Sequence, residues 1–136
     1  MRVLVAIRPQ QITRALRVSN HILEYAARLA RLTRPGGEDS PSWCAEHIAW
    51  GAGPRAGQAL ILAAKARALL RGSFAVTRAD VRDVALPVLR HRIVPSFQAE
   101  AEGLSTDDLV ARLVGETSPF PITEDYDAAT RRILRS

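Results

Sequence analysis

The residues best suited to chemistry lie at the start of an apolar stretch, WGAGPRAGQALILAAKARALL, which runs from Trp50 to Leu70. Here Gly53 can cap a helix, Pro54 suits the first helical turn, and Arg55 follows directly. Free backbone N–H groups and the helix dipole attract anions to such a start, and an arginine fork matches phosphate oxygens. The pattern therefore indicates contact with a phosphate group. Its alternative is a solvated arginine after an ordinary Gly-Pro turn.

A complete phosphate-binding loop is absent from the sequence. Such a loop needs Gly-x-x-x-x-Gly-Lys-Ser/Thr, whereas the single lysine, Lys65, follows Ala64 inside the apolar stretch. Asp107 and Asp108 precede a helical pattern instead of ending an apolar strand, so they do not resemble a magnesium-binding acidic pair. We therefore expect no catalytic residue in this chain, and a nucleotide that is held mainly by something else.

Spacing typical of metal ligands is also missing. His21, His47 and His91 lie far apart in the sequence, and Cys44 is the single cysteine. One cysteine cannot form an intramolecular disulfide, and this usage fits a reducing compartment. We expect no metal site and a cytoplasmic location.

The composition of the chain limits the kinds of partner that it could bind. The chain has 136 residues and 47% hydrophobic content, which suits one domain with its own core. The net charge is +5, but the basic residues are spread from Arg2 to Arg135 and are interleaved with acids. This distribution does not favour nucleic acid as the partner. No apolar run is long enough to cross a membrane, so we expect no membrane partner.

The elements that position these residues are predicted to be helices. Apolar residues recur at the spacing of one helix face, and Gly and Pro punctuate the chain between such segments. Helices are expected over Pro9–Arg17, Ser19–Thr33, Pro54–Arg71, Thr77–Leu89 and Ser105–Glu116, with a short helix or turn over Ser42–Trp50. We find no strand alternation. The predicted fold class is all-α, a small bundle of about four to five helices.

Three local signals refine this prediction. The helix after Pro54 is almost wholly apolar, which favours a place at the centre of the bundle. Thr77 with Asp80 three residues later resembles a capping box. Pro87 is expected to bend its helix or to restart it.

The segment WGAGPRAGQALILAAKARALLRGSFAVTRADVRDVALPVLRHRI resembles the C-terminal lid of MoxR-family AAA+ ATPases. In that family a Gly-Ala-Ser-Pro-Arg-Ala segment opens the lid helix. An Ala/Leu-rich run, a Val-Thr-x-x-Asp-Val turn and a Val-Leu-Arg-His-Arg segment then follow. The flanking segments ILEYAARLARLTRP and FQAEAEGLSTDDLVARL are similar as well, so the resemblance covers residues 18–114.

The resemblance implies that Arg55 is the second sensor arginine of the family, with Gly53 and Pro54 shaping the helix start. Such an arginine reaches the γ-phosphate of ATP, which a separate nucleotide-binding core holds with Mg²⁺. Members of the family form rings, commonly hexamers, and act as chaperone-like ATPases. Several work with proteins that carry von Willebrand factor A domains. The implied function is a lid that couples ATP hydrolysis to remodelling and is not catalytic alone.

Two features depart from the family pattern. Gly53 stands where serine is usual, which a cap position tolerates. The nucleotide-binding core is not in this sequence, so we expect no tight nucleotide binding by this chain alone. Residues 1–116 are expected to form the lid, and residues 117–136 a C-terminal extension or tail. The alternative function is a small basic helical adaptor that binds a protein partner or nucleic acid.

Overall fold

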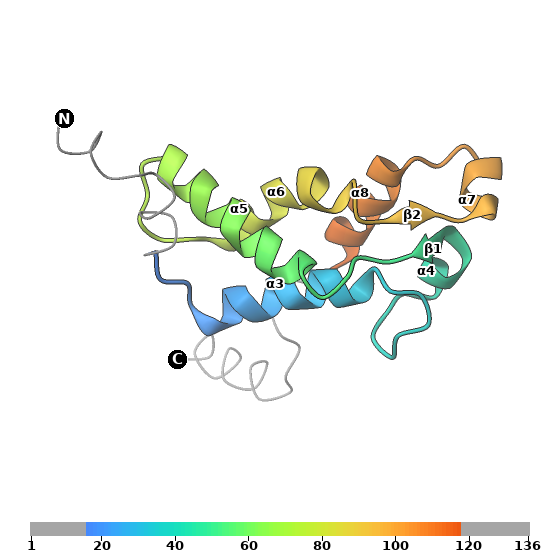
Figure 1. The fold of residues 1–136 in the computed structure, drawn as a ribbon, viewed down its shortest axis with the longest axis horizontal. Coiled ribbons are helices and arrows are strands. Elements are labelled where there is room, and N and C mark those ends of the chain that lie inside the picture. The colour runs from blue at the N-terminus through green and yellow to red at the C-terminus, as the bar shows by residue number, and fades with distance from the viewer. Residues whose placement is uncertain (1–15, 118–136) are drawn as a thin grey trace, which may run out of the picture.

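Six helices and two short strands make up residues 16–117, the part of the chain that the computed structural model describes (Figure 1). In chain order they are α3 (Asn20–Leu32), α4 (Ser42–His47), β1 (Ile48–Trp50), α5 (Ala56–Leu70), α6 (Arg78–Leu89), β2 (Val94–Pro95), α7 (Phe97–Ala101) and α8 (Thr106–Glu116). The all-α prediction is confirmed. The helix expected at Pro9–Arg17 and the tail expected at 117–136 fall almost wholly outside the described residues.

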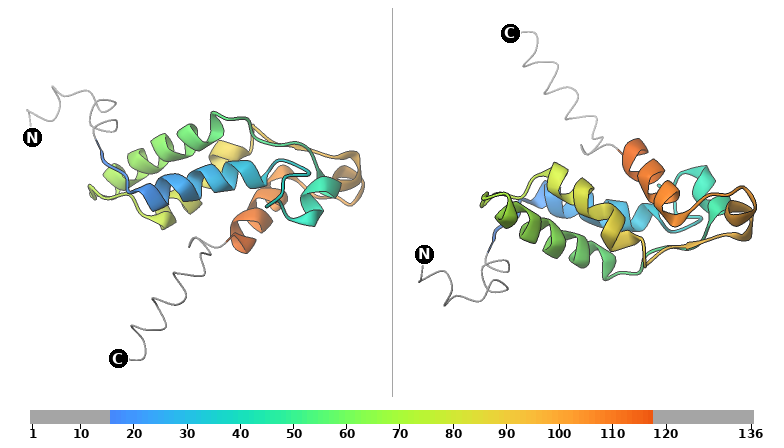
Figure 2. Two further views of the ribbon diagram at one scale, coloured as in Figure 1. Left: turned by 90° about the horizontal axis from the view of Figure 1, so that it is seen from below. Right: turned by 90° about the horizontal axis from the view of Figure 1, so that it is seen from above.

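Helices α3, α5 and α6 form a three-helix bundle, and α8 packs against α3 and α6 (Figures 1 and 2). The apolar stripe expected on α3 is buried as predicted, and so are the apolar positions of α8. The buried side chains of these two helices are Ile22, Tyr25, Ala26, Leu29, Ala30, Leu32, Leu109, Val110 and Leu113. The sequence periodicity therefore identifies the faces that meet in the core.

Helix α5 is buried along one stripe only, so the prediction that it lies at the bundle centre is wrong in part. Ala56, Leu60, Ala64 and Ala68 are completely covered, because their four-residue spacing puts them on the face that meets α3 and α6. By contrast, the Leu62 side chain is 50% exposed. The small alanines fill the shared core, and part of the apolar surface of α5 remains uncovered.

Helix α6 begins with the predicted capping box. The Thr77 hydroxyl accepts a hydrogen bond from the Asp80 backbone N–H, and the Asp80 carboxylate accepts one from the Thr77 N–H. Arg71, the C-cap residue of α5, donates two hydrogen bonds to the same carboxylate, at 3.0 and 2.7 Å. Burial raises the pKa of Asp80, but the hydrogen bonds from Arg71 and Thr77 outweigh it, so the pKa lies below its ordinary value. One carboxylate thus joins the end of α5 to the start of α6.

Helix α6 does not restart at Pro87. It continues through this residue to Leu89. Pro87 lies in the last turn and its ring is exposed, so the missing backbone N–H affects a helix that is already ending.

The two strands and α7 were not predicted. β1 and β2 pair antiparallel, with Ile48 opposite Pro95 and Trp50 opposite Val94. Immediately after β2, the Ser96 hydroxyl caps α7 by accepting a hydrogen bond from the Ala99 N–H. Strands of two and three residues are too short to show alternation, so the sequence pattern could not reveal them.

Helix α4 is tied to α8 by a polar cluster at one end of the domain. The Trp43 indole N–H donates to Glu116 at 2.7 Å, and the Arg112 guanidinium lies 4.6 Å from the centre of the Trp43 ring. Hydrogen bonds from Trp43 and from Arg112 hold the pKa of Glu116 below its usual range. These contacts attach the β-ribbon end of the domain to the bundle.

The substitution Asp80→Asn should lower the free energy of unfolding by about 2 kcal/mol at neutral pH, because a buried carboxylate loses charge-assisted hydrogen bonds. Urea denaturation of both proteins measures this difference. Since the folded-state pKa is lowered, the difference should persist above the ordinary aspartate pKa of about 3.9 and vanish as the pH falls through the folded value.

Asp83→Asn provides the matched control. Asp83 lies in the same helix and pairs with Arg67 of α5 at 2.9 Å, but both side chains are about half exposed. We expect a change of less than about 1 kcal/mol, as for a surface ion pair. Equal losses in the two variants would contradict the role given to Asp80.

Candidate functional site

Arg55 lies at the start of α5, and the helix begins at Ala56, two residues after the expected start at Pro54. Its backbone is the N-cap of α5, so Gly53 is not the N-cap residue as predicted. The Ala56 N–H bonds to the Gly53 carbonyl at 3.0 Å, which closes a turn over Pro54 and Arg55 before the α-helix begins. The Ala59 N–H then bonds to the Arg55 carbonyl. Gly53, Pro54 and Arg55 therefore form a tight turn that leads into the helix.

The Arg55 side chain is exposed, and nothing among residues 16–117 pairs with it. Several other arginines use their guanidinium groups within the domain: Arg67, Arg71, Arg90 and Arg112 meet carboxylates. Within residues 16–117, Arg55 makes no hydrogen bond or ion pair with another side chain. Its donors are thus available to an acceptor that approaches from outside.

The segment before this turn packs directly on the end of α3. An added Cβ on Gly51 would lie 2.6 Å from the Thr33 carbonyl oxygen and 2.7 Å from the Arg34 Cα, closer than real Cβ atoms approach backbone. Only glycine permits this contact between two main chains. The approach fixes where the chain enters the turn that carries Arg55.

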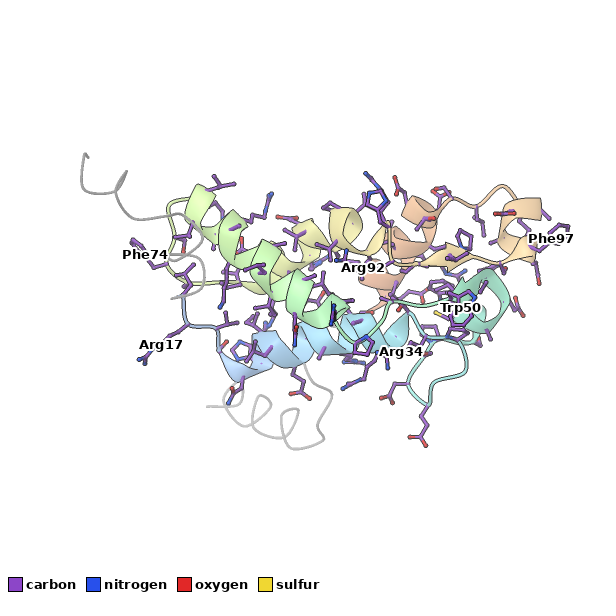
Figure 3. The ribbon with its side chains drawn as sticks, in the orientation of Figure 1. Arg17, Arg34, Trp50, Phe74, Arg92 and Phe97 are labelled. Atoms are coloured by element: carbon purple, nitrogen blue, oxygen red, sulfur yellow. The ribbon has the colours of Figure 1, made fainter. Side chains whose placement is uncertain are left out.

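Two side chains complete the anchor between α3 and the Gly51–Gly53 segment. The Thr33 hydroxyl accepts a hydrogen bond from the Ala52 N–H at 2.8 Å and donates one to the Ala30 carbonyl at 2.7 Å. Arg34 Nε donates to the Ala52 carbonyl at 3.2 Å. Both backbone groups of Ala52 are therefore satisfied by residues at the end of α3. Figure 3 shows Arg34 near Trp50, the last residue of β1.

Sequence reasoning missed the positioning residues Thr33 and Arg34. They follow the last apolar position of α3, where a polar pair ordinarily marks a helix end. Nothing in their type or spacing connects them with Ala52, which lies 19 residues after Thr33. The connection exists because the 34–41 loop and α4 return the chain to the end of α3.

The other candidate residues do not join Arg55. His47 is buried and its Nε2 lies 2.9 Å from a Glu102 carboxylate oxygen, so it links α4 with the end of α7. His91 is exposed, in the segment between α6 and β2. Across residues 16–117 no cluster of His, Cys, Asp and Glu could hold a metal ion. No helix in this part of the chain is both long and apolar enough to cross a membrane.

Comparisons with known proteins agree with this geometry. Residues 41–113 match the family model described as the AAA lid domain, and this span holds the Gly51–Arg55 turn. Over 112 residues the chain is 35% identical to the protein named Chaperone MoxR1 from Mycobacterium tuberculosis. That match covers 79% of this chain and 29% of MoxR1.

A solved structure shows the same fold. It is a crystal structure of a protein assigned as an ATPase from Cytophaga hutchinsonii, with a TM-score of 0.73 and 30% sequence identity. The match covers 79% of this chain and 33% of that protein. The present chain thus spans about a third of the length of the proteins it matches. The family model, the MoxR1 relative and the shared fold together place the chain in the AAA lid domain family, as the lid of a MoxR-like AAA+ ATPase.

Proposed function

We propose that Arg55 is the sensor-2 arginine of this lid and contacts the γ-phosphate of ATP, which a separate nucleotide-binding core holds with Mg²⁺. The observation that carries this proposal is the exposed guanidinium of Arg55, which has no partner in the described part of the chain and stands at an anchored helix start. Gly53 and Pro54 leave the approach to Arg55 open, since neither carries a long side chain.

The physics of the site supports a phosphate more than another ligand. A guanidinium presents parallel N–H donors that match two phosphate oxygens, and it stays charged at any physiological pH. The positive end of the α5 dipole lies in the same turn and adds a partial positive charge. A single arginine and one helix start cannot offset the cost of ordering a triphosphate, so this chain alone should bind ATP very weakly.

We further propose that the lid moves as one body when its contact with nucleotide changes. Hydrolysis removes the γ-phosphate, and Arg55 then loses its acceptor. Because Ala52 is bonded to Thr33 and Arg34, a displacement of Arg55 is transmitted to α3 as well as to α5. In a ring of such ATPases, for which a hexamer is the expected form, this motion would drive chaperone-like remodelling. We include proteins that carry von Willebrand factor A domains among the proposed partners of this ATPase.

The substitution Arg55→Ala should lower ATP turnover severalfold or more in a protein that joins this lid to its nucleotide-binding core. The reason is the loss of the charge that meets the γ-phosphate. Steady-state hydrolysis measures the effect, and thermal unfolding should show an unchanged lid because the side chain is exposed and pairs with nothing in the part of the chain that the structure describes.

Arg17→Ala is the control for this prediction. Arg17 is also an exposed arginine, but Figure 3 places it at the end of the domain where α3 begins, away from the start of α5. Its removal should leave turnover unchanged. Normal turnover in the Arg55→Ala variant would sink the sensor assignment.

Gly51→Ala should lower ATP turnover by displacing Arg55, although it leaves the Arg55 side chain unchanged. The added methyl group meets the backbone of Thr33 and Arg34, so the Gly51–Gly53 segment must shift and the unfolding free energy should fall by about 1–3 kcal/mol. Turnover should fall as well, because Arg55 moves with the segment. Urea denaturation and hydrolysis assays measure the two effects.

Gly53→Ala makes the same chemical change two residues later, where an added Cβ has no neighbour within 4 Å. We expect a stability change within about 0.5 kcal/mol and near-normal turnover. If Gly51→Ala proved as mild as Gly53→Ala, the backbone contact would not position Arg55.

A further inference from the structure

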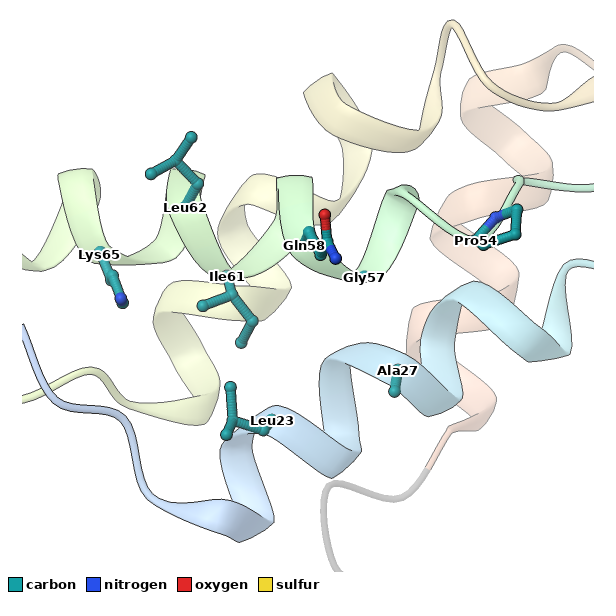
Figure 4. Close-up of a pocket in the computed structure, with 8 residues that line it drawn as sticks. All are labelled: Leu23, Ala27, Pro54, Gly57, Gln58, Ile61, Leu62 and Lys65. Atoms are coloured by element: carbon teal, nitrogen blue, oxygen red, sulfur yellow. The ribbon is translucent and has the colours of Figure 1, made fainter. Parts of the chain in front are cut away.

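A groove runs between α3 and α5 and begins beside Arg55. Its volume is about 480 Å³. The lining residues are Leu23 and Ala27 of α3, with Pro54, Gly57, Gln58, Ile61, Leu62 and Lys65 from the α5 side (Figure 4). Most of these side chains are apolar, yet the groove is open on the surface of the domain.

Small residues create this groove. A Cβ added to Gly57 would lie 3.6 Å from the Ala27 Cα, an ordinary van der Waals contact, so the two helices approach closely here. Leu23 and Leu62 also line the groove, beside Gly57 and Ala27, and their side chains remain 42% and 50% exposed. Two leucines on facing helices thus remain partly exposed beside the groove.

The charge that lines the groove is positive. Lys65 is the charged residue among the lining side chains, and Arg55 follows Pro54 in the sequence without lining the groove itself. Neither basic side chain has a partner within residues 16–117. No lining residue is acidic, and the carboxylate next to the groove in sequence is Glu24, which follows Leu23.

We propose that this groove binds an amphipathic helix of a partner protein, with an apolar stripe toward Leu23, Ile61 and Leu62 and acidic residues toward Lys65. The walls are helices, whose backbone groups are bonded internally, so the groove offers no free edge to an added strand. A third helix that lies along both walls buries apolar side chains at i, i+3, i+4 and i+7 spacing. The Lys65 ammonium group sets the preference for acidic flanks.

The position of the groove connects this partner with the start of α5. Pro54 and Gly57 lie in the turn and first helical residues that also carry Arg55. A helix seated against them contacts the same segment that Gly51 and Thr33 anchor from the other side. The partner would thus hold the part of the lid that positions Arg55.

Fluorescence anisotropy of two labelled peptides with the full chain, without nucleotide, tests the proposal. Each peptide is longer than about 15 residues, so that it can form a helix, and has leucine on one face. One carries glutamate on its other faces and the second carries lysine there. The glutamate peptide should bind saturably and at least roughly threefold more tightly than the lysine peptide, and Lys65→Glu should reduce or reverse this preference.

Leu62→Glu and Leu70→Glu form a matched pair of variants. Both leucines belong to α5 and are exposed, but only Leu62 lines the groove. Leu62→Glu should weaken binding of the glutamate peptide by at least about tenfold, as for a buried interface residue, while Leu70→Glu leaves it nearly unchanged. Circular dichroism confirms that both variants keep their helices.

Three results would overturn the proposal: no binding of either peptide, equal binding of both, or equal losses in the two leucine variants. Sedimentation of the chain without peptide tests whether a second copy of the chain occupies the groove. A dimer that Leu62→Glu dissociates and Leu70→Glu does not would assign the groove to a second copy of the chain. Because no nucleotide is present, failure here leaves the assignment of Arg55 untouched, and failure of that assignment leaves the groove untouched.

Discussion

The main-chain contact between Gly51 and the Thr33–Arg34 segment determines the geometry of everything around it. The two backbones approach so closely that no side chain fits between them, and Thr33 and Arg34 then satisfy both backbone groups of Ala52. The loop that precedes α5 therefore behaves as part of α3. This constraint fixes the Gly-Pro-Arg turn that carries Arg55.

Ion pairs between arginines and carboxylates connect the helices of the domain. Arginines near the ends of helices meet carboxylates: Arg71 joins α5 to Asp80 of α6, and Arg90 joins the end of α6 to Asp107 of α8. Each of these pairs connects the end of one helix to the start of another. In the described part of the chain, four arginines pair with carboxylates, a minority of the 19 basic residues of the whole sequence. Within residues 16–117, Arg55 and Lys65 lie outside this network.

The sequence predicted the elements that are long or chemically marked, and missed those that depend on tertiary contact. The stripe on α3 and the Thr77–Asp80 capping box are local patterns, and both are confirmed. β1, β2 and α7 are too short to carry a pattern, and the Thr33–Ala52 hydrogen bond joins distant residues. The apolar character of α5 indicated full burial, but alanine-sized contacts cover only one stripe of it. The family resemblance identified Arg55, and its proposed contact with ATP stays a prediction.

The length of α5 has a mechanical consequence. Its 15 residues make a rigid rod of about 22 Å, anchored at the Arg55 end. Because Arg71 and Asp80 tie the far end to α6, the helix turns only together with the rest of the domain, and a rotation of the domain by about 10° around the Arg55 end would move the far end by about 4 Å. The far end carries Leu70 and, in the turn beyond it, Phe74, whose side chains are 91% and 79% exposed. In such a rotation, the exposed apolar side chains of Leu70 and Phe74 would move farthest against any neighbouring surface.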